Sequence, residues 1–305
     1  MVETSILKEI EAFASKGALL YNEPLRNHTT FKVGGEADAF LSVKTQEELV
    51  KALQWCCEKE MPYFVMGNGS NLLVSDKGFR GLVISIGREM ARITCEGNRI
   101  TAQAGALLST VAQVAAKNGL AGMEFASGIP GTIGGAMVMN AGAYDGEMKM
   151  IVESVTVLSQ EGEVRTFSNE EMEFGYRTSR LKKEKGIVLE VTVLLQEGDK
   201  DAILGKMNDF AARRREKQPL EYPSAGSTFK RPEGHFAGKL IMDAGLRGYT
   251  VGGAQVSEKH CGFVINKESA TAGDVYTLIH DVQEKVKEAF GVTLEPEVIF
   301  VGDFR

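Results

Sequence analysis

The chain lacks the features that mark several large classes of protein. Its 305 residues carry 35 Lys and Arg against 41 Asp and Glu, and a net charge of −6 does not offset repulsion from a nucleic-acid backbone. No apolar run reaches the roughly 18 residues of a membrane span, and charged residues replace the apolar core of a signal peptide at the N-terminus. The cysteines Cys56, Cys57, Cys95 and Cys261 form no CxxC pair and no zinc-ligand spacing. We therefore expect a cytoplasmic protein with small-molecule partners, no nucleic acid, no membrane span and no metal.

Two common nucleotide-binding motifs are also missing. No GxxxxGK[ST] occurs, which excludes a Walker-type phosphate loop. Gly67 and Gly69 begin a G-x-G-x-x-G pattern, but Leu72 stands where the third glycine should be. A Rossmann-type dinucleotide site is therefore not predicted.

Glycine is nevertheless concentrated in two segments that each follow a strand-like run. The first is VMGNGSNLLV, and the second is EFASGIPGTIGGAMVMNAGAYDG, from Glu124 to Gly146. Each alone is more typical of a set of tight turns than of a cofactor site. Together they present backbone N–H groups and small polar side chains that could hold a pyrophosphate without a cation, because each charge-assisted hydrogen bond contributes about 1.5–3 kcal/mol.

Helix and strand patterns mix without a regular βαβ alternation, which favours an α+β fold over a doubly wound sheet. Thr45 and Glu48 form a capping box that predicts a helix over roughly 45–60. Thr271 to Gly291 bound a second helix, with an apolar stripe formed by Val275, Ile279, Val282, Val286 and Phe290. The only dense basic run, Arg213–Arg215 with Lys217, favours a solvated helix end over a ligand-phosphate role.

Five motifs in order resemble one family. GNGSNLLV, GIPGTIGGAMVMNAGAY, GYRTSRL, YPSAGSTFKRP and LEPEVIFVG are similar to the UDP-N-acetylenolpyruvoylglucosamine reductases, in their shorter type without an inserted tyrosine loop. The resemblance implies an FAD-binding domain of the vanillyl-alcohol-oxidase/PCMH type in two subdomains, over residues 1–88 and 89–205. It also implies a C-terminal α+β substrate-binding domain over 206–305, whose final strand returns Glu297 to the active site.

The same resemblance implies the cofactors and the residues that hold them. We expect FAD as the cofactor and NADPH as the hydride-donating co-substrate. None of His28, His235, His260 and His280 lies in a glycine segment, so the FAD is expected to be non-covalent. The residues expected at the cofactor are Gly67, Asn68, Gly69, Ser70, Asn71, Ser127, Gly128, Pro130, Gly131, Thr132, Gly134, Gly135, Asn140 and Ala141.

Three further positions match the catalytic residues of the family. Ser227 matches the proton donor, Arg177 the arginine that grips the substrate carboxylate, and Glu297 the catalytic glutamate. By themselves these residues are more typical of a turn serine, a surface arginine and an edge-strand glutamate than of catalytic residues. Substrate contacts are expected at Lys230, Arg231 and His260.

The implied reaction is the NADPH-driven reduction of UDP-N-acetylglucosamine enolpyruvate to UDP-N-acetylmuramate, in peptidoglycan precursor synthesis. Hydride passes from reduced flavin to the enolpyruvyl group, and Ser227 supplies the proton. Two alternatives stay open. One is an FAD-dependent oxidase of a small alcohol or hydroxy acid, and the other is a non-catalytic UDP-sugar-binding module.

Overall fold

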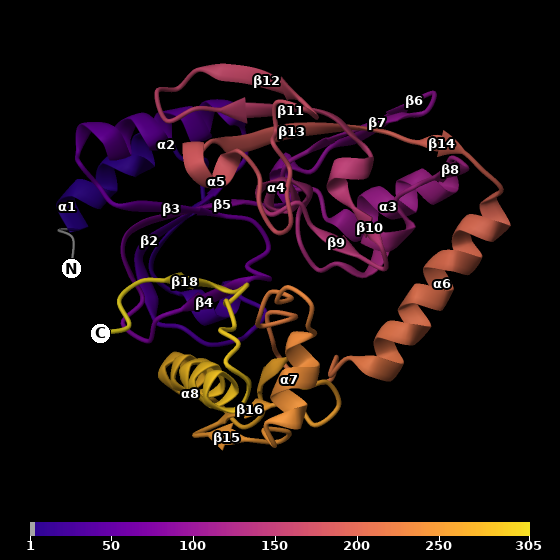
Figure 1. The fold of residues 1–305 in the computed structure, drawn as a ribbon. Helices are drawn as coiled ribbons and strands as arrows, with labels where there is room; N and C mark the ends of the chain where they lie inside the picture. The colour runs from indigo at the N-terminus through magenta and orange to yellow at the C-terminus, as the bar shows by residue number, and fades with distance from the viewer. Residues whose placement is uncertain (1–3) are drawn as a thin grey trace. The chain divides into compact units, whose positions relative to one another are not determined.

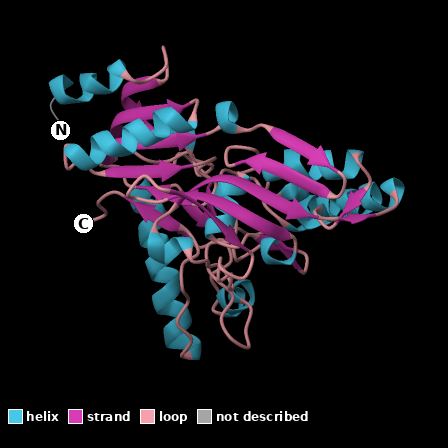
Figure 2. Cartoon of the chain, turned by 90° about the horizontal axis from the view of Figure 1, so that it is seen from above, coloured by secondary structure: helices cyan, strands magenta, loops and turns pink. Residues whose placement is uncertain are grey.

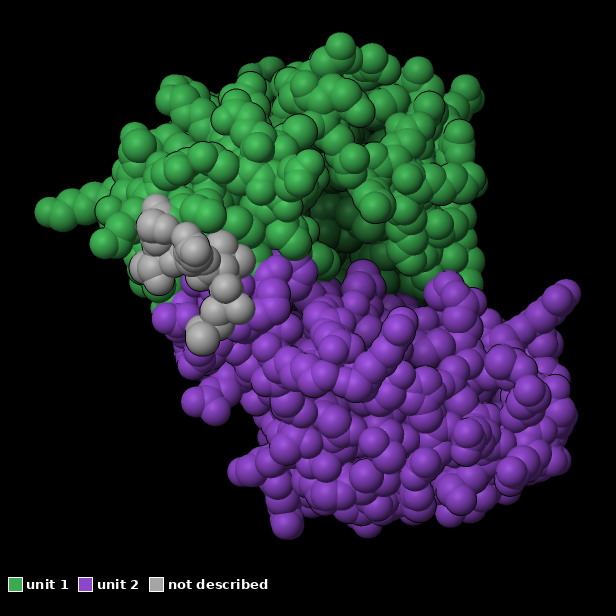
Figure 3. All heavy atoms as spheres, turned by 90° about the vertical axis from the view of Figure 1, so that its left-hand side faces the viewer, with its two compact units in different colours: residues 1–21, 39–68, 81–214 green, residues 22–38, 69–80, 215–305 purple. Residues whose placement is uncertain are grey.

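A computed structural model describes residues 4–305, and the chain divides into two compact units. Unit 1 contains the residues up to Tyr21, Ala39–Asn68 and Gly81–Arg214; unit 2 contains Asn22–Asp38, Gly69–Arg80 and Arg215–Arg305. The units are coloured separately in Figure 3. Four elements continue from one unit into the other: β1 (Leu19–Pro24), β2 (Glu36–Val43), β5 (Phe79–Ile86) and α6 (Lys200–Lys217).

Unit 1 is organised around a five-stranded antiparallel sheet of order β12-β11-β13-β7-β6 (Figure 1). A four-stranded sheet of order β1-β2-β5-β3 contains the three continuing strands, and β3 pairs parallel to β5. The remaining helices of unit 1 are α1 (Thr4–Leu7), α2 (Gln46–Glu58), α3 (Leu108–Lys117), α4 (Ile133–Val138) and α5 (Leu181–Glu184). Its remaining strands are β3 (Tyr63–Met66), β6 (Ile93–Glu96), β7 (Arg99–Gln103), β8 (Leu120–Ala121), β9 (Gly142–Ala143), β10 (Gly146–Glu147), β11 (Val152–Leu158), β12 (Val164–Ser168), β13 (Ile187–Leu194) and β14 (Gln196–Glu197).

The central strands of this sheet are rich in β-branched residues. Strand β13 reads IVLEVTVL, and Val191 and Val193 are fully buried. They pair with Ala102 and Ile100 of β7, which are also fully buried. Branched side chains pack well on a pleated surface, and burial on one face fixes the register, since a one-residue slip would expose every apolar side chain.

Unit 2 has its own hydrophobic core. Its helices are α7 (Ala237–Asp243) and α8 (Ala272–Phe290), and its strands are β4 (Leu72–Val74), β15 (Thr250–Val251), β16 (Ala254–Val256), β17 (Val264–Asn266) and β18 (Ile299–Val301). Strands β15, β16 and β17 form one sheet, and β18 pairs parallel to β4. Helices and strands are both abundant in the chain (Figure 2), which confirms the α+β class.

Helix α8 follows the sequence prediction closely. Thr271 and Asp274 form a reciprocal capping box, and Gly291 ends the helix at φ 70°. Val275, Ile279, Val282 and Val286 are fully buried in the core of unit 2. Phe290, predicted to complete the stripe, is 41% exposed, so that part of the prediction was wrong. The last turn of α8 extends beyond the core it covers.

Glu48 joins helix α2 to the N-terminal segment of unit 1. The residue is 8% exposed, and its carboxylate accepts hydrogen bonds from Ser15 N at 2.8 Å and Lys44 N at 2.6 Å, as well as from the Ser15 hydroxyl. Thr45 caps the helix by accepting from Glu48 N. Burial alone would raise the pKa of Glu48, but the hydrogen bonds to its charged form outweigh burial and lower the pKa below its usual value.

We expect Glu48→Gln to lower the free energy of unfolding at pH 7 by about 1.5–3 kcal/mol, the usual value of a hydrogen bond to a charged group. The native pKa is lowered, so the stabilisation is present above the unfolded pKa and is lost as the pH falls through the native one. Urea unfolding at pH 7 and pH 3 measures both effects. Glu47→Gln is the matched control, because its partner is Lys51 on the exposed side of α2. A difference between Glu48→Gln and wild type that persists unchanged at pH 3 contradicts the assignment.

Candidate functional site

The two glycine-rich segments meet within unit 1. Strand β3 ends at Met66, and a Cβ atom placed on the next residue, Gly67, would lie 2.3 Å from Thr132 Oγ1. Asn68 Nδ2 donates to the carbonyl oxygen of Pro130 at 2.5 Å. Only a residue without a side chain permits the first contact, so Gly67 is required for the approach of the two segments.

Thr132 organises the second segment by capping helix α4. Its hydroxyl accepts from Gly135 N at 3.3 Å. A Cβ at Gly134 would lie 2.8 Å from Ala104 Cβ, and Gly134 N donates to Ala104 O at 2.9 Å. The amide of Gly134 is therefore already hydrogen-bonded to Ala104, and the contribution of Gly134 is close backbone approach rather than a free donor.

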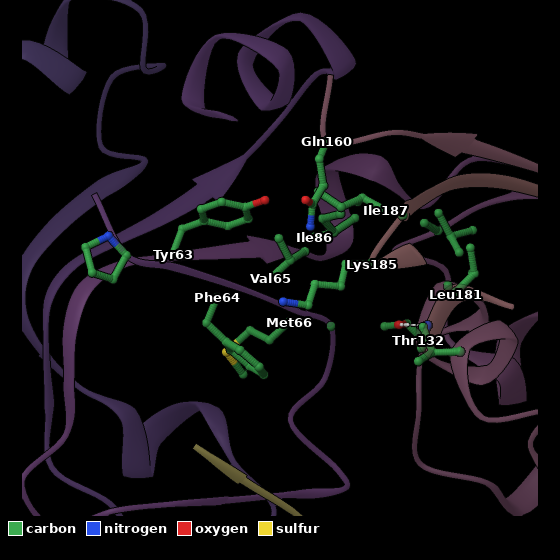
Figure 4. A pocket seen from close by; sticks show the side chains of 18 of the residues that line it. Tyr63, Phe64, Val65, Met66, Ile86, Thr132, Gln160, Leu181, Lys185 and Ile187 are labelled. Atoms are coloured by element: carbon green, nitrogen blue, oxygen red, sulfur yellow. Dashed lines mark hydrogen bonds between the residues drawn. The ribbon is translucent and has the colours of Figure 1, made fainter. Parts of the chain in front are cut away.

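A cavity of about 690 Å³ opens beside these glycines, entirely within unit 1 (Figure 4). Its lining includes strand β3, four of the expected cofactor residues (Gly67, Thr132, Gly134 and Gly135) and the segment Lys185–Val188. Its volume lies in the range of about 300–1,000 Å³ that is usual for ligand pockets. An apolar wall beside glycine-rich backbone suits an aromatic base joined to phosphates, so these residues fit a dinucleotide such as FAD.

Two segments that line this cavity carried no functional signal in the sequence. Tyr63–Met66 resembled an ordinary apolar strand, and Lys185–Val188 lay outside every motif. Figure 4 shows the Lys185 side chain extending from its loop toward Val65 and Met66 of β3. Lys185 has φ 52° at the end of α5, which turns the chain sharply into β13. Such a turn is decided by tertiary packing, because lysine has no preference for the left-handed region.

Hydrogen bonds of Asn140 and Arg177 connect the glycine-rich segment to the loop of Arg177 in unit 1. Asn140 is 0% exposed; its side chain donates to Gly175 O at 3.1 Å and accepts from Lys149 N at 2.9 Å. Gly175 and Thr178 bracket a tight turn in which Arg177 has φ 53°. Arg177 Nη2 donates to Gly142 O at 3.3 Å. The glycine-rich segment and the loop of Arg177 thus hold each other in place.

The other expected cofactor residues occupy the same loops. Ser127 Oγ donates to Glu124 O at 2.8 Å, and Gly131 O accepts from Leu108 N at 3.0 Å. Ala141 is buried, as is Gly69, which has φ 60°. Ser70 is half-buried. Gly69, Ser70 and Asn71 belong to unit 2, where Gly69 O accepts from Thr30 N at 3.2 Å.

Unit 2 brings the Ser227 and Glu297 segments together. Glu297 N donates to Thr228 O at 2.8 Å, and Asn71 Nδ2 donates to Glu297 O at 3.0 Å. Thr228 is fully buried and accepts from Val264 N through its hydroxyl, which fixes the residue next to Ser227. Ser227 itself is exposed and follows Gly226 at φ 76°. Glu297 is half-buried and lies two residues before β18, rather than within the predicted strand.

The three expected substrate residues also lie in unit 2. Lys230 Nζ forms an ion pair with Glu295, and the guanidinium of Arg231 lies 4.0 Å from the centre of the Phe236 ring. His260 packs edge-on against Phe263 at 5.0 Å, and its Nδ1 accepts from Gly262 N at 3.1 Å. Burial lowers the pKa of His260. The imidazole therefore favours its neutral form, with the hydrogen on Nε2.

Comparisons with known proteins match family models to two parts of the chain. Residues 37–168 match a family model described as an FAD binding domain, and residues 218–301 match the C-terminal domain of UDP-N-acetylenolpyruvoylglucosamine reductase. The chain is 53% identical to the reductase of that name from Lachnoclostridium phytofermentans, over 98% of this chain and 97% of the other. It is 50% identical to the one from Caldanaerobacter subterraneus, over 98% of both. The crystal structure of the Thermus caldophilus reductase matches with a TM-score of 0.81 and 39% identity, over 93% of this chain and 98% of that one.

The environment of His260 predicts its titration. We expect its ring to gain a proton only below the ordinary midpoint of about 6.5, because burial disfavours the charged form. NMR titration of the histidine Cε1 protons measures the midpoint, and His260→Gln identifies the resonance. A midpoint at or above that of a free histidine would show that the ring is not desolvated in solution.

Proposed function

The chain belongs to the UDP-N-acetylenolpyruvoylglucosamine reductase family, and from that premise we propose how its own residues serve the reaction. The enzyme is an FAD-dependent, NADPH-driven oxidoreductase of peptidoglycan precursor synthesis. It reduces UDP-N-acetylglucosamine enolpyruvate to UDP-N-acetylmuramate. The relatives that are about half identical over nearly the whole chain are reductases. The two alternatives, an oxidase and a non-catalytic sugar-binding module, are therefore not favoured.

One contact supports the assignment of FAD binding to particular residues. Gly67 lies against Thr132 at the 690 Å³ cavity, and Asn68 donates to Pro130, so the start of the first glycine-rich segment meets the second segment within unit 1. We assign FAD binding to the residues expected from the sequence, which are Gly67 to Asn71, Ser127, Gly128, Pro130, Gly131, Thr132, Gly134, Gly135, Asn140 and Ala141. Bound FAD supplies hydride transfer between NADPH and the enolpyruvyl double bond. The protein must bind, orient and protonate the substrate.

Ser227 is assigned as the proton donor to the α-carbon of the enolpyruvyl group. Its exposed hydroxyl is carried by a segment fixed on both sides, by Gly226 at positive φ and by the buried Thr228. A hydroxyl is a weak acid, but a carbanion-like centre is a strong base, so the proton transfer is favourable. Glu297, hydrogen-bonded to the neighbouring backbone, is assigned as the carboxylate that supports this transfer.

Arg177 is assigned to the substrate carboxylate. Its planar guanidinium can grip a carboxylate at two points, and it stabilises the negative charge that builds on the adjacent enolate. The hydrogen bond from Asn140 to Gly175 O holds the loop that carries Arg177.

The UDP-sugar contacts are assigned to Lys230, Arg231 and His260. The proposed domains are residues 1–88 and 89–205 for FAD and 206–305 for the substrate. We also propose a cytoplasmic location, supported by four cysteines that are all free.

Replacement of Ser227 by alanine should separate the two halves of the reaction. We expect NADPH to bleach the flavin absorbance at the wild-type rate, while reoxidation by the enolpyruvyl substrate slows by roughly a hundredfold or more. Anaerobic stopped-flow spectroscopy measures each half. Ser224→Ala, which removes a hydroxyl from the same loop, is the control. Equal loss in both halves would refute the proton-donor role.

Arg177→Lys tests the carboxylate contact. Loss of the two-point grip should lower kcat/KM for the enolpyruvyl substrate by about 10- to 100-fold, the effect of one lost charged hydrogen bond. NADPH-driven flavin reduction should be unchanged. Arg180→Lys is the matched control, because Arg180 pairs with Glu184 and the Glu171 carbonyl on the surface of unit 1. Steady-state kinetics with both variants decides the question, and similar losses in the two would exclude a specific role for Arg177.

A further inference from the structure

Arg214, near the end of helix α6, has a buried donor with no partner. Its Nε atom is inaccessible to solvent and makes no hydrogen bond, and no carboxylate of the described residues forms an ion pair with it. The preceding residue behaves differently, since Arg213 pairs with Asp209 at 2.8 Å one turn earlier in the helix. A buried donor left unsatisfied costs about 1–3 kcal/mol, and more when it belongs to a charged group. A bound anion would satisfy this charged group by accepting hydrogen bonds from it.

The guanidinium of Arg214 lies against Gly128. A Cβ at Gly128 would be 2.9 Å from Nη1, 3.1 Å from Cζ and 3.2 Å from Nε. Three nearly equal distances mean that the flat face of the guanidinium covers this glycine. Gly128 belongs to the segment Ser127–Gly135, so a permanent positive charge lies directly on the second glycine-rich segment.

Helix α6 is held in this position by aromatic packing within unit 1. Phe210 stacks on Tyr144 with ring centres 4.3 Å apart, and the Tyr144 hydroxyl donates to Phe210 O at 3.2 Å. Phe210 and Met207 also pack against the core of the unit. Tyr144 is itself part of the glycine-rich sequence. The basic run favoured a solvated helix end in the sequence, and for Arg214 that interpretation was wrong.

We propose that Arg214 is the cation of the FAD site and that this half-buried residue binds a phosphate oxygen of the FAD diphosphate through its guanidinium. This inference rests on the proposed function, which assigns the glycine-rich segments to FAD. Charge-assisted hydrogen bonds from arginine to phosphate are about twice as strong as neutral ones. The glycine segments contain no lysine or arginine, and Arg214 supplies that charge from a helix some 80 residues away in sequence. The UDP-sugar also carries a diphosphate, so the test must separate the two.

Retention of FAD by the holoenzyme provides that test. Arg214→Ala should release FAD about 10- to 100-fold faster than wild type, as expected for one lost charged phosphate contact. The rise of flavin fluorescence after dilution measures release, and the 450/280 nm absorbance ratio after gel filtration measures occupancy. Arg213→Ala is the matched control and should retain FAD like wild type. Arg214→Lys keeps the charge, so its rate of FAD release should lie between those of wild type and Arg214→Ala. Circular dichroism verifies that each variant is folded.

Two further outcomes separate the inference from its premise. If Arg214→Ala retains FAD normally but raises KM for the UDP-sugar, the arginine serves the substrate and the proposal is overturned. If Gly134→Ala and Arg214→Ala both retain FAD normally, the glycine-rich segments do not hold the cofactor and the proposed function fails with it. If Gly134→Ala loses FAD and Arg214→Ala retains it, the glycine-rich segments hold FAD without help from Arg214, and the inference about Arg214 is wrong.

A double-mutant cycle with Gly128 tests the contact itself. Gly128→Ala must displace the guanidinium, because no Cβ fits beneath it. In the Arg214→Ala background the same change should add little, since the group it displaces is gone. Additive effects of the two substitutions on FAD release would show that Gly128 and Arg214 act separately and would contradict the proposed arrangement.

Discussion

The contact between Gly67 and Thr132 is the constraint on which the cofactor region depends. A side chain at Gly67 would overlap the Thr132 hydroxyl, which also caps helix α4. The end of β3 and the start of α4 therefore meet only because one of them carries no Cβ atom. This single close approach joins two segments more than 60 residues apart and creates the edge of the cavity that lies between them.

The positive charge in this region comes from a residue outside the glycine-rich segments. Backbone donors can surround a diphosphate closely because glycine leaves space, but they carry only partial charge. A long side chain inside the loops would fill that space. An arginine brought in from α6 avoids the conflict, since its flat guanidinium lies on Gly128 instead of entering the loop. Aromatic packing of Phe210 on Tyr144 holds it there.

The fold was largely readable from local patterns, whereas much of the site was not. Helix α8 showed its cap, its stripe and its glycine stop in the sequence, because each is a local signal. The glycine segments were also visible. The hydrogen-bond partners of individual groups were not: Gly134 N donates to Ala104 O, and the Asn140 side chain bonds with Lys149 N and Gly175 O. Lys185 and Arg214 reach their positions through packing between distant segments, which no local pattern encodes.

The discontinuous make-up of unit 2 has a consequence during biosynthesis. Phe31 and Leu73 are fully buried in a core completed by Val275, Ile279 and Val286 of α8. A ribosome that adds about 5–20 residues per second needs on the order of tens of seconds to translate from the first of these residues to the last. Throughout that interval the early apolar segments have no partner. The second core can therefore close only when translation is almost finished, and until then its early apolar side chains stay exposed.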